Sequence, residues 1–250
     1  MKNRIYERKS KHSLLGIIMT LSFLVLGGNS FAQKQEIDVT PEDLKLEKDY
    51  SPYAGNSYPN KVLFGDTHLH TKYSPDAGMV GTTLDVDDAY RFASGETVEG
   101  NSGQRVQLVR PLDFLVVTDH AEYIGLAPMI RDSDPVLLAD PYGKWLHDKF
   151  RTGNEDDLME AFKSMLNDAA TGNSQFSSDE ATRSIWNKFV HTAEKYNTPG
   201  KFTALTGFEW TSMPDGNNLH RVVVFADDVD KTSQILPYTV FDSSDPEDLW

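Results

Sequence analysis

The chain has 250 residues, no cysteine and a formal charge of -14 at pH 7. Without cysteine it can form no disulfide and carry no lipid-modified bacterial N-terminus. Its acidic charge repels the phosphate backbone of nucleic acid, and no local basic patch offsets that charge in the mature part. We therefore expect no nucleic-acid partner.

Residues 1–32 have the pattern of a secretory signal peptide. Basic residues come first, and the apolar run Leu14–Leu26 follows; its 13 residues are too few to span a bilayer comfortably. Ser30 and Ala32 are the small residues that a signal peptidase requires. Cleavage after Ala32 removes five positive charges and one negative charge, so the mature part carries -18. We expect a periplasmic or secreted protein without a stable membrane span; an uncleaved anchor is the alternative.

The first half of the mature chain contains turn-rich segments around one expected strand and one expected helix. Residues 33–60 are charged and rich in turn formers, which indicates an arm or linker. The domain is expected over residues 61–250, and its first element is a short buried strand over 61–66. A short helix containing residues 87–93 follows, which Thr83 can cap. The polar, glycine-bearing segment 95–103 is typical of a hairpin or excursion.

The second half alternates strands with a long helical segment. An apolar strand is expected over 112–117, and the periodicity of residues 128–197 predicts three helices, which we interpret as a helical insertion. Two more strands are expected over 201–206 and 221–226. The final residues, 244–250, have the cap, proline and acids of a helix start. Because the sequence stops there, we expect a C-terminally truncated domain.

His68 and His70 follow the first strand, one residue apart. Alternate side chains of a strand point to the same face, so the two imidazoles converge on one side. Two imidazoles that close together suit a metal ion better than they fill a core. A pair of surface histidines is the alternative interpretation.

The same arrangement recurs twice along the chain. Asp119 and His120 follow the second strand directly, and Glu209 follows the third. The ends of parallel strands lie at one face of a strand-helix protein, where sites are built. We therefore expect an imidazole pair, an Asp-His pair and a carboxylate to meet there and bind metal.

These motifs resemble those of the PHP (polymerase and histidinol phosphatase) superfamily. Phe64–Gly78 is similar to its first motif, Asp113–His120 to its second and Gly207–Glu209 to its third. A closer similarity is to an exported PHP-like family of unknown function, and it rests on four stretches: Phe64–Asp66, Thr118–Tyr123, Gly207–Ser212 and Gly216–Arg221. The resemblance covers roughly Lys61–Trp250.

The resemblance implies an α/β fold of a particular kind, a distorted (β/α)7 TIM-like barrel that binds two or three divalent ions. By position, His68 and His70 would hold one ion and Glu209 would bridge it to a second, for which His220 is a candidate ligand. Asp76 and His120 would hold the third. Asp119 would ligate or orient His120, and Asp66 would lie just outside the ligands.

This sequence departs from the superfamily pattern in one respect that concerns whether the domain is complete. Its members supply further ligands from later strands, including a terminal Asp-x-His, whereas no histidine follows His220 here. We expect these ligands beyond the end of this sequence, so the barrel is incomplete in this chain.

The ligand types suit zinc, manganese or iron. A cluster of two or three such ions would activate a water molecule. We assign the catalytic work to Asp119, His120 and Glu209. Lys72 and Arg221 are the cations nearest the motifs and can hold a phosphate, unless they are ordinary surface charges.

The sequence thus predicts an exported metal-dependent hydrolase, a phosphoesterase acting on a small phosphate ester. An amidohydrolase-type enzyme that cleaves an amide or lactone is an alternative, although the lysine and later histidines of such enzymes are not visible. A third alternative is an inactive fragment or binding module. The sequence indicates no oligomeric state.

Overall fold

The structure is a computed structural model that describes residues 61–249. The predicted signal peptide, the predicted arm over residues 33–60 and Trp250 lie outside the described residues. Among the residues that are described, no helix is both long and apolar enough to cross a membrane.

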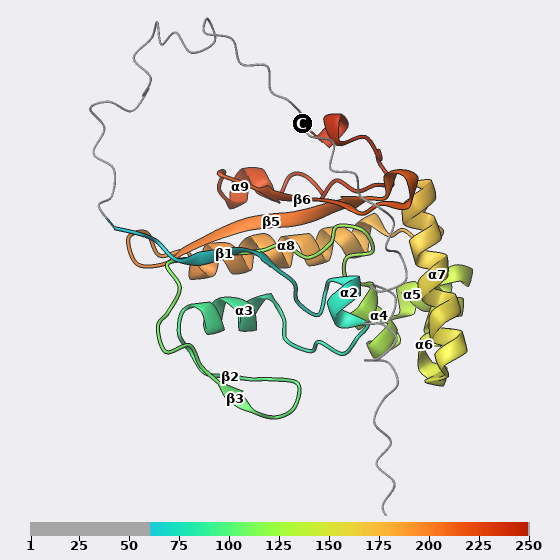
Figure 1. Cartoon of the computed structure of the whole chain (residues 1–250), viewed down its shortest axis with the longest axis horizontal. Helices are drawn as coiled ribbons and strands as arrows, with labels where there is room; N and C mark the ends of the chain where they lie inside the picture. Colours follow the sequence, from blue (N-terminus) through green and yellow to red (C-terminus); the bar gives the residue numbers. More distant parts are fainter. Residues whose placement is uncertain (1–60, 250) are drawn as a thin grey trace, which may run out of the picture. The chain divides into compact units, whose positions relative to one another are not determined.

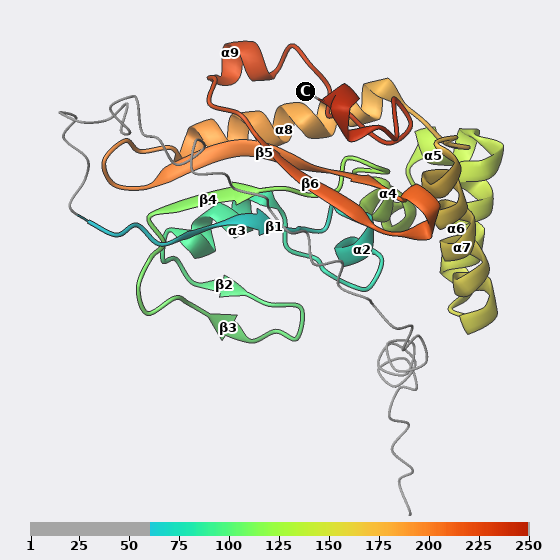
Figure 2. The same ribbon diagram turned by 45° about the horizontal axis from the view of Figure 1, so that its top comes forward.

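A four-stranded mixed sheet organises the described residues (Figure 1). Its strand order is β1 (Gly65–Leu69), β4 (Phe114–Val117), β5 (Thr203–Ser212) and β6 (Leu219–Val224). The first three strands are parallel, and β6 runs antiparallel to β5. The sheet curls, as the turned view in Figure 2 shows, and this is consistent with an incomplete α/β barrel. The α/β class is therefore confirmed.

The strands differ from the predicted ones at their ends. β1 begins at Gly65 instead of residue 61, β5 continues to Ser212 instead of stopping at 206, and β6 begins at Leu219. The prediction followed apolar runs, whereas strand pairing depends on backbone hydrogen bonds that polar residues also make. As a result, His68, Glu209 and His220 lie within strands.

The first strand is exposed, contrary to the prediction of a buried one. Residues of β1 are exposed from Gly65 to His68, because among the described strands it pairs only with β4 and so forms an edge of the sheet. The apolar residues before it, Val62–Phe64, are exposed as well. The buried strand is β4, whose Leu115–Val117 are almost fully enclosed, as expected for a strand between two neighbours.

Two helices cover one face of the sheet. α3 (Val86–Ala93) and α8 (Asp179–Tyr196) pack their apolar sides against the residues of β4 and β5 that point to this face of the sheet. The shared core comprises Val86, Tyr90, Ala93, Leu115, Val117, Trp186, Phe189, Val190, Phe208 and Trp210. Since side chains alternate along a strand, this leaves Glu209 and its neighbours two residues away on the opposite face.

Asp85, not Thr83, caps α3. The Asp85 carboxylate accepts hydrogen bonds from the backbone N–H groups of Asp87 and Asp88. The Thr83 hydroxyl instead donates to the Asn101 side chain, at 2.7 Å. A carboxylate is also the better partner for the positive end of the helix dipole.

The predicted helical stretch 128–197 contains five helices in place of three, and the first begins at residue 126. They are α4 (Leu126–Asp132), α5 (Pro135–Ala139), α6 (Pro141–Thr152), α7 (Glu155–Thr171) and α8. The two that the prediction missed, α4 and α5, have seven and five residues, too few to show a helical apolar stripe. α4 to α7 enclose a second apolar cluster around Leu137, Leu146 and Ala161.

The remaining elements are short. The predicted hairpin exists as β2 (Val98–Glu99) and β3 (Arg105–Val106), with its second strand beyond residue 103. α2 (Pro75–Gly78) is a single turn. The other turns are η1 (Pro214–Gly216), α9 (Val229–Thr232) and η2 (Pro246–Leu249), the last lying where a helix start was predicted.

Candidate metal centre

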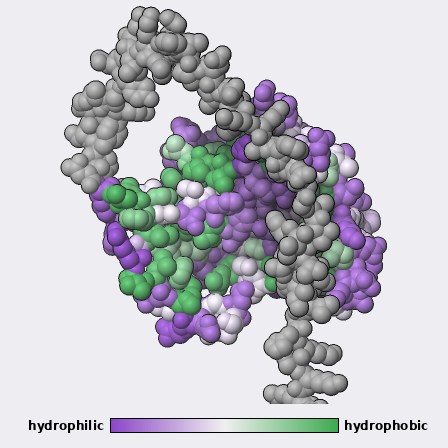
Figure 3. Space-filling view, viewed as in Figure 1, coloured by the Kyte–Doolittle hydropathy of each residue, from purple (hydrophilic) through white to green (hydrophobic). Residues whose placement is uncertain are grey.

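The face of the sheet opposite α3 and α8 collects the histidines of the sequence motifs. His68 lies in β1 and His70 directly after it, Glu209 lies in β5 and His220 in β6. His120, just past β4, pairs with Glu209 in a parallel β-bridge. Figure 3, which views the molecule as in Figure 1, shows a hydrophilic patch near the centre of the face in view, beside hydrophobic surface.

Glu209 is the hub of this cluster. One carboxylate oxygen, Oε2, lies 3.2 Å from His68 Nε2, 2.9 Å from His70 Nε2 and 3.3 Å from His120 Nδ1. The other oxygen, Oε1, lies 3.0 Å from His220 Nδ1. One carboxylate thus contacts four imidazoles that come from three separate segments of the chain.

The Glu209 carboxylate fits a cation better than it fits a core. Its side chain is 1% exposed, and neither oxygen has a hydrogen-bond partner of good geometry. His70 Nε2 is likewise buried without such a partner. Burying an unsatisfied carboxylate is costly, and a bound cation removes that cost. The donor set of imidazole nitrogens and carboxylate oxygens matches what divalent metals bind.

A second carboxylate, Asp76 in α2, lies beside the same histidines. Its Oδ2 is 2.9 Å from His70 Nδ1 and 3.6 Å from His120 Nε2. The Ser74 hydroxyl donates to Asp76 Oδ1 at 2.5 Å and accepts from the His120 backbone N–H at 3.2 Å. Ser74, which is fully buried, therefore holds the short helix against the segment after β4.

The charges of the cluster are strongly linked. Burial disfavours the charged form of His70, but its hydrogen bond with Asp76 and the nearby charge of Glu209 outweigh this effect and raise the pKa of His70 to about 10. For Asp76, burial works against ionisation, and bonds with His120, His70 and Ser74 nevertheless hold its pKa far below the usual range. The pKa of Glu209 is lowered in the same way, mainly by His70 against the effect of burial.

Three overlapping groups of side chains in this cluster could hold a metal ion. Within each group, one ligand atom per residue lies within 4.8 Å of the others. The groups are His68, His70 and Glu209; His70, Asp76 and His120; and His120, Glu209 and His220. All six residues predicted as metal ligands belong to these groups.

Asp66 and Asp119 lie outside these groups. Asp66 Oδ1 accepts the His68 backbone N–H at 2.9 Å. Asp119, fully buried, accepts hydrogen bonds from the backbone N–H and the hydroxyl of Thr71. Burial raises the pKa of Asp119 to about 7, although the bonds from Thr71 oppose this rise. Asp119 thus holds the segment directly after His70, and its catalytic role remains a prediction.

The two cations expected near a phosphate have other partners. Lys72 Nζ lies 3.4 Å from Asp85 Oδ2. Arg221 is exposed and donates to the His220 carbonyl at 2.8 Å. Neither contact involves a ligand side chain, so their phosphate-binding role also remains a prediction.

Sequence reasoning assigned no role to Thr211, whose hydroxyl contacts two of the histidines. Its Oγ1 lies 2.8 Å from His120 Nδ1 and 3.0 Å from His220 Nδ1. The available signal was its position two residues after Glu209, which puts both side chains on one face of a strand.

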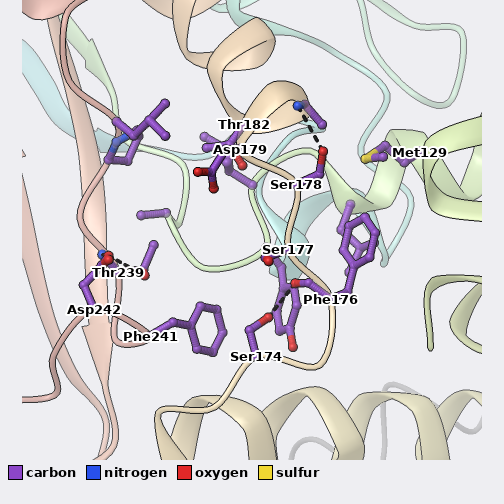
Figure 4. Close-up of a pocket in the computed structure, with 17 residues that line it drawn as sticks. Met129, Ser174, Phe176, Ser177, Ser178, Asp179, Thr182, Thr239, Phe241 and Asp242 are labelled. Atoms are coloured by element: carbon purple, nitrogen blue, oxygen red, sulfur yellow. Dashed lines mark hydrogen bonds between the residues drawn. The ribbon is translucent and has the colours of Figure 1, made fainter. Parts of the chain in front are cut away.

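Figure 4 shows a cavity of about 360 Å³ that is not part of this cluster. Its walls come from the segment after His120, the start of α8 and the stretch 236–242, and none of the six ligand-type residues lines it. Its charged lining residues are carboxylates, Asp179 and Asp242, with no lysine or arginine. The cavity therefore lacks the charge to attract a phosphate.

Comparisons with known proteins give one match. A family model described as "Protein of unknown function (DUF3604)" matches residues 57–250. No curated protein and no solved structure matches the chain. Because the matched residues make up most of the sequence, the chain belongs to the DUF3604 family.

Proposed function

We propose that this chain is an exported metal-dependent hydrolase that cleaves a phosphate ester. The observation that carries the proposal is the buried Glu209 carboxylate, which contacts four imidazoles and has no hydrogen-bond donor of good geometry. An arrangement that is costly without a cation and favourable with one is the expected signature of a metal centre.

The two oxygens of Glu209 suit a bridging role. Oε2 faces His68 and His70, whereas Oε1 faces His220. One ion would be held on each side of the carboxylate. Asp76 and His120 offer ligands for a third ion, so the described residues have donors for two or three divalent ions. Zinc, manganese and iron all accept this mixture of nitrogen and oxygen ligands.

Ions held there would lower the pKa of water and neutralise charge on a phosphoryl group. The chain's own residues would prepare this chemistry. Glu209 and Asp76 keep negative charge beside the imidazoles, Ser74 holds Asp76 against His120, and Asp119 positions the segment after His70. The motif resemblance to the PHP superfamily supports phosphate esters as the substrate class.

Export belongs to the same proposal. It is supported by the basic, apolar and small-residue sequence pattern of residues 1–32, which lie outside the described residues. We expect the mature protein in the periplasm or outside the cell.

Metal analysis of the purified full chain tests the proposal. His68→Ala and Glu209→Ala should each lose bound metal and hydrolysis, while His191→Ala, on the exposed side of α8, should retain both. Undiminished metal and turnover in the first two variants would remove the proposal. A panel of phosphate monoesters, phosphodiesters, amides and lactones identifies the reaction, and turnover of amides or lactones alone would favour an amidohydrolase-type enzyme.

A further inference from the structure

The Thr211 hydroxyl lies between two histidines that belong to the candidate metal centre. Oγ1 is 2.8 Å from His120 Nδ1 and 3.0 Å from His220 Nδ1. The register of the sheet causes this, because Thr211 in β5 pairs with His220 in β6 and lies two residues beyond the partner of His120. Both contacts are within normal hydrogen-bond range.

Counting protons restricts the tautomers of these rings. A hydroxyl has one proton to donate, so it can serve at most one ring nitrogen that lacks a proton. If both contacts are hydrogen bonds, at least one of the two rings must carry its proton on Nδ1. The Thr211 hydroxyl oxygen accepts that proton.

The contacts of the two rings identify which one this is. On Nδ1 the rings are alike, because each faces Thr211 Oγ1 and one oxygen of Glu209, at 3.3 Å for His120 and 3.0 Å for His220. His220 makes both of these polar contacts through Nδ1, so Nδ1 would be its ligand atom; it then carries no proton and takes the proton of the Thr211 hydroxyl. The proton count therefore leaves His120 as the ring that carries its proton on Nδ1. The opposite nitrogen, Nε2, is then free of a proton and faces Asp76 Oδ2 at 3.6 Å.

We propose that Thr211 is a positioning residue: its hydroxyl accepts the Nδ1 proton of His120 and thereby directs Nε2 of that ring to an ion shared with Asp76. The inference rests on the proposed metal function. It assigns His120 to the Asp76 ion, although geometry alone includes His120 in two of the three groups. Metal-binding histidines commonly have their second nitrogen held in this way.

Glu122 keeps Thr211 in place. β4 ends at Val117, so the Thr211 N–H has no strand carbonyl on that side, and Glu122 Oε1 accepts it at 3.2 Å. The same oxygen accepts the Val240 N–H at 2.9 Å. The Glu122 side chain is buried, so this anchor joins β5 to the segment after α9 away from solvent.

A matched pair of variants of the full chain tests the role of Thr211. Thr211→Val keeps the branched shape and removes the hydroxyl, whereas Thr211→Ser keeps the hydroxyl. Long-range ¹H–¹⁵N NMR spectra of histidine-labelled protein report the ring tautomer, with and without added zinc, at mildly alkaline pH. Zinc titrations report affinity.

In the wild type and in Thr211→Ser, His120 should carry its proton on Nδ1, and zinc should bind through Nε2. In Thr211→Val the other tautomer should appear, and zinc affinity at one site should fall about 10- to 100-fold. Unchanged tautomer and affinity in Thr211→Val would overturn the proposal. So would a wild-type His120 protonated on Nε2, even if the valine variant did not fold.

These outcomes are separable from failure of the proposed function. A wild-type protein that binds no zinc removes the metal centre itself, but the tautomer of His120 can still be read from the metal-free protein. A protein that binds zinc equally well with Thr211→Val keeps the metal centre and removes only the role of Thr211.

Discussion

His120 and Glu209 face each other in a parallel β-bridge beyond the end of β4. Backbone hydrogen bonds fix this pair: the Glu209 N–H donates to the Asp119 carbonyl at 3.0 Å, and the Ala121 N–H donates to the Glu209 carbonyl at 2.8 Å. Two ligand-type side chains from segments about ninety residues apart are thus held by sheet pairing itself. Sites built on regular elements hold their geometry better than sites on loops.

Replacing the hub carboxylate by its amide should abolish the metal centre. Glu209→Gln keeps the shape but removes the charge that balances the imidazoles, so we expect metal affinity to fall roughly 100-fold or more, beyond the usual cost of changing a supporting residue. Glu160→Gln, at an exposed glutamate, is the control. Equilibrium dialysis followed by metal analysis measures the effect, and equal metal content in both variants would contradict it.

Metal binding should release a proton from His70. With its pKa raised to about 10 in the metal-free protein, His70 is protonated at neutral pH and must lose that proton to bind a metal. Affinity should therefore rise about tenfold per pH unit, for one proton, up to about pH 10. Calorimetry in two buffers of different ionisation enthalpy measures the release; identical heats in both would refute it.

Asp85 should stabilise the fold both as a helix cap and as a charge. Burial opposes its ionisation, but contacts with Lys188, the Asp88 backbone and Lys72 prevail and lower its pKa below the ordinary 3.8. Asp85→Ala should cost about 1–2 kcal/mol, and Asp85→Asn, which can still cap α3, less than about 1 kcal/mol. Urea unfolding measures both losses of stability. Equal losses in the two variants would show that capping is not the main contribution of Asp85.

The charge of Asp85 also predicts how the stability of the fold changes with pH. Because its pKa is lower in the folded protein than in the unfolded chain, the stabilisation is present above about pH 4 and is lost as the pH falls through the folded-state pKa. The stability difference between wild type and Asp85→Asn should therefore shrink in acid. A difference that grows as the pH falls would contradict the assignment.

Gly207 should tolerate no side chain. A Cβ there would lie 2.7 Å from the Val223 carbonyl oxygen and 2.7 Å from Val116 Cγ1, and the carbonyl belongs to a paired strand that cannot move easily. We expect Gly207→Ala to destabilise the protein by about 1–3 kcal/mol. The control, Gly100→Ala, meets nothing closer than 3.7 Å and should change stability little. Thermal unfolding compares the two.

The number of helices and the ends of the strands could not be predicted from the sequence and were established by the structure. Apolar periodicity indicated the longer helices of residues 128–197 but not α4 and α5, which are too short for a stripe to develop. It also ended the third strand before Glu209, because Gly207, Glu209 and Thr211 interrupt the apolar run, although most of residues 207–212 are buried. Backbone pairing with β6 continues the strand to Ser212, and apolar patterning carries no record of that pairing.

The ligand-type residues, and their meeting at one site, could be predicted from the amino-acid sequence. Apolar runs before His68, Asp119 and Glu209 predict strands, and parallel strands in one sheet bring such residues to one face. The atoms that meet could not be predicted and are known from the folded structure: Glu209 contacts four imidazoles, Asp119 accepts hydrogen bonds from Thr71, and Thr211 lies between His120 and His220. The reason is physical, because residue types and spacing limit the face on which a side chain lies, whereas strand register and side-chain packing select its partner.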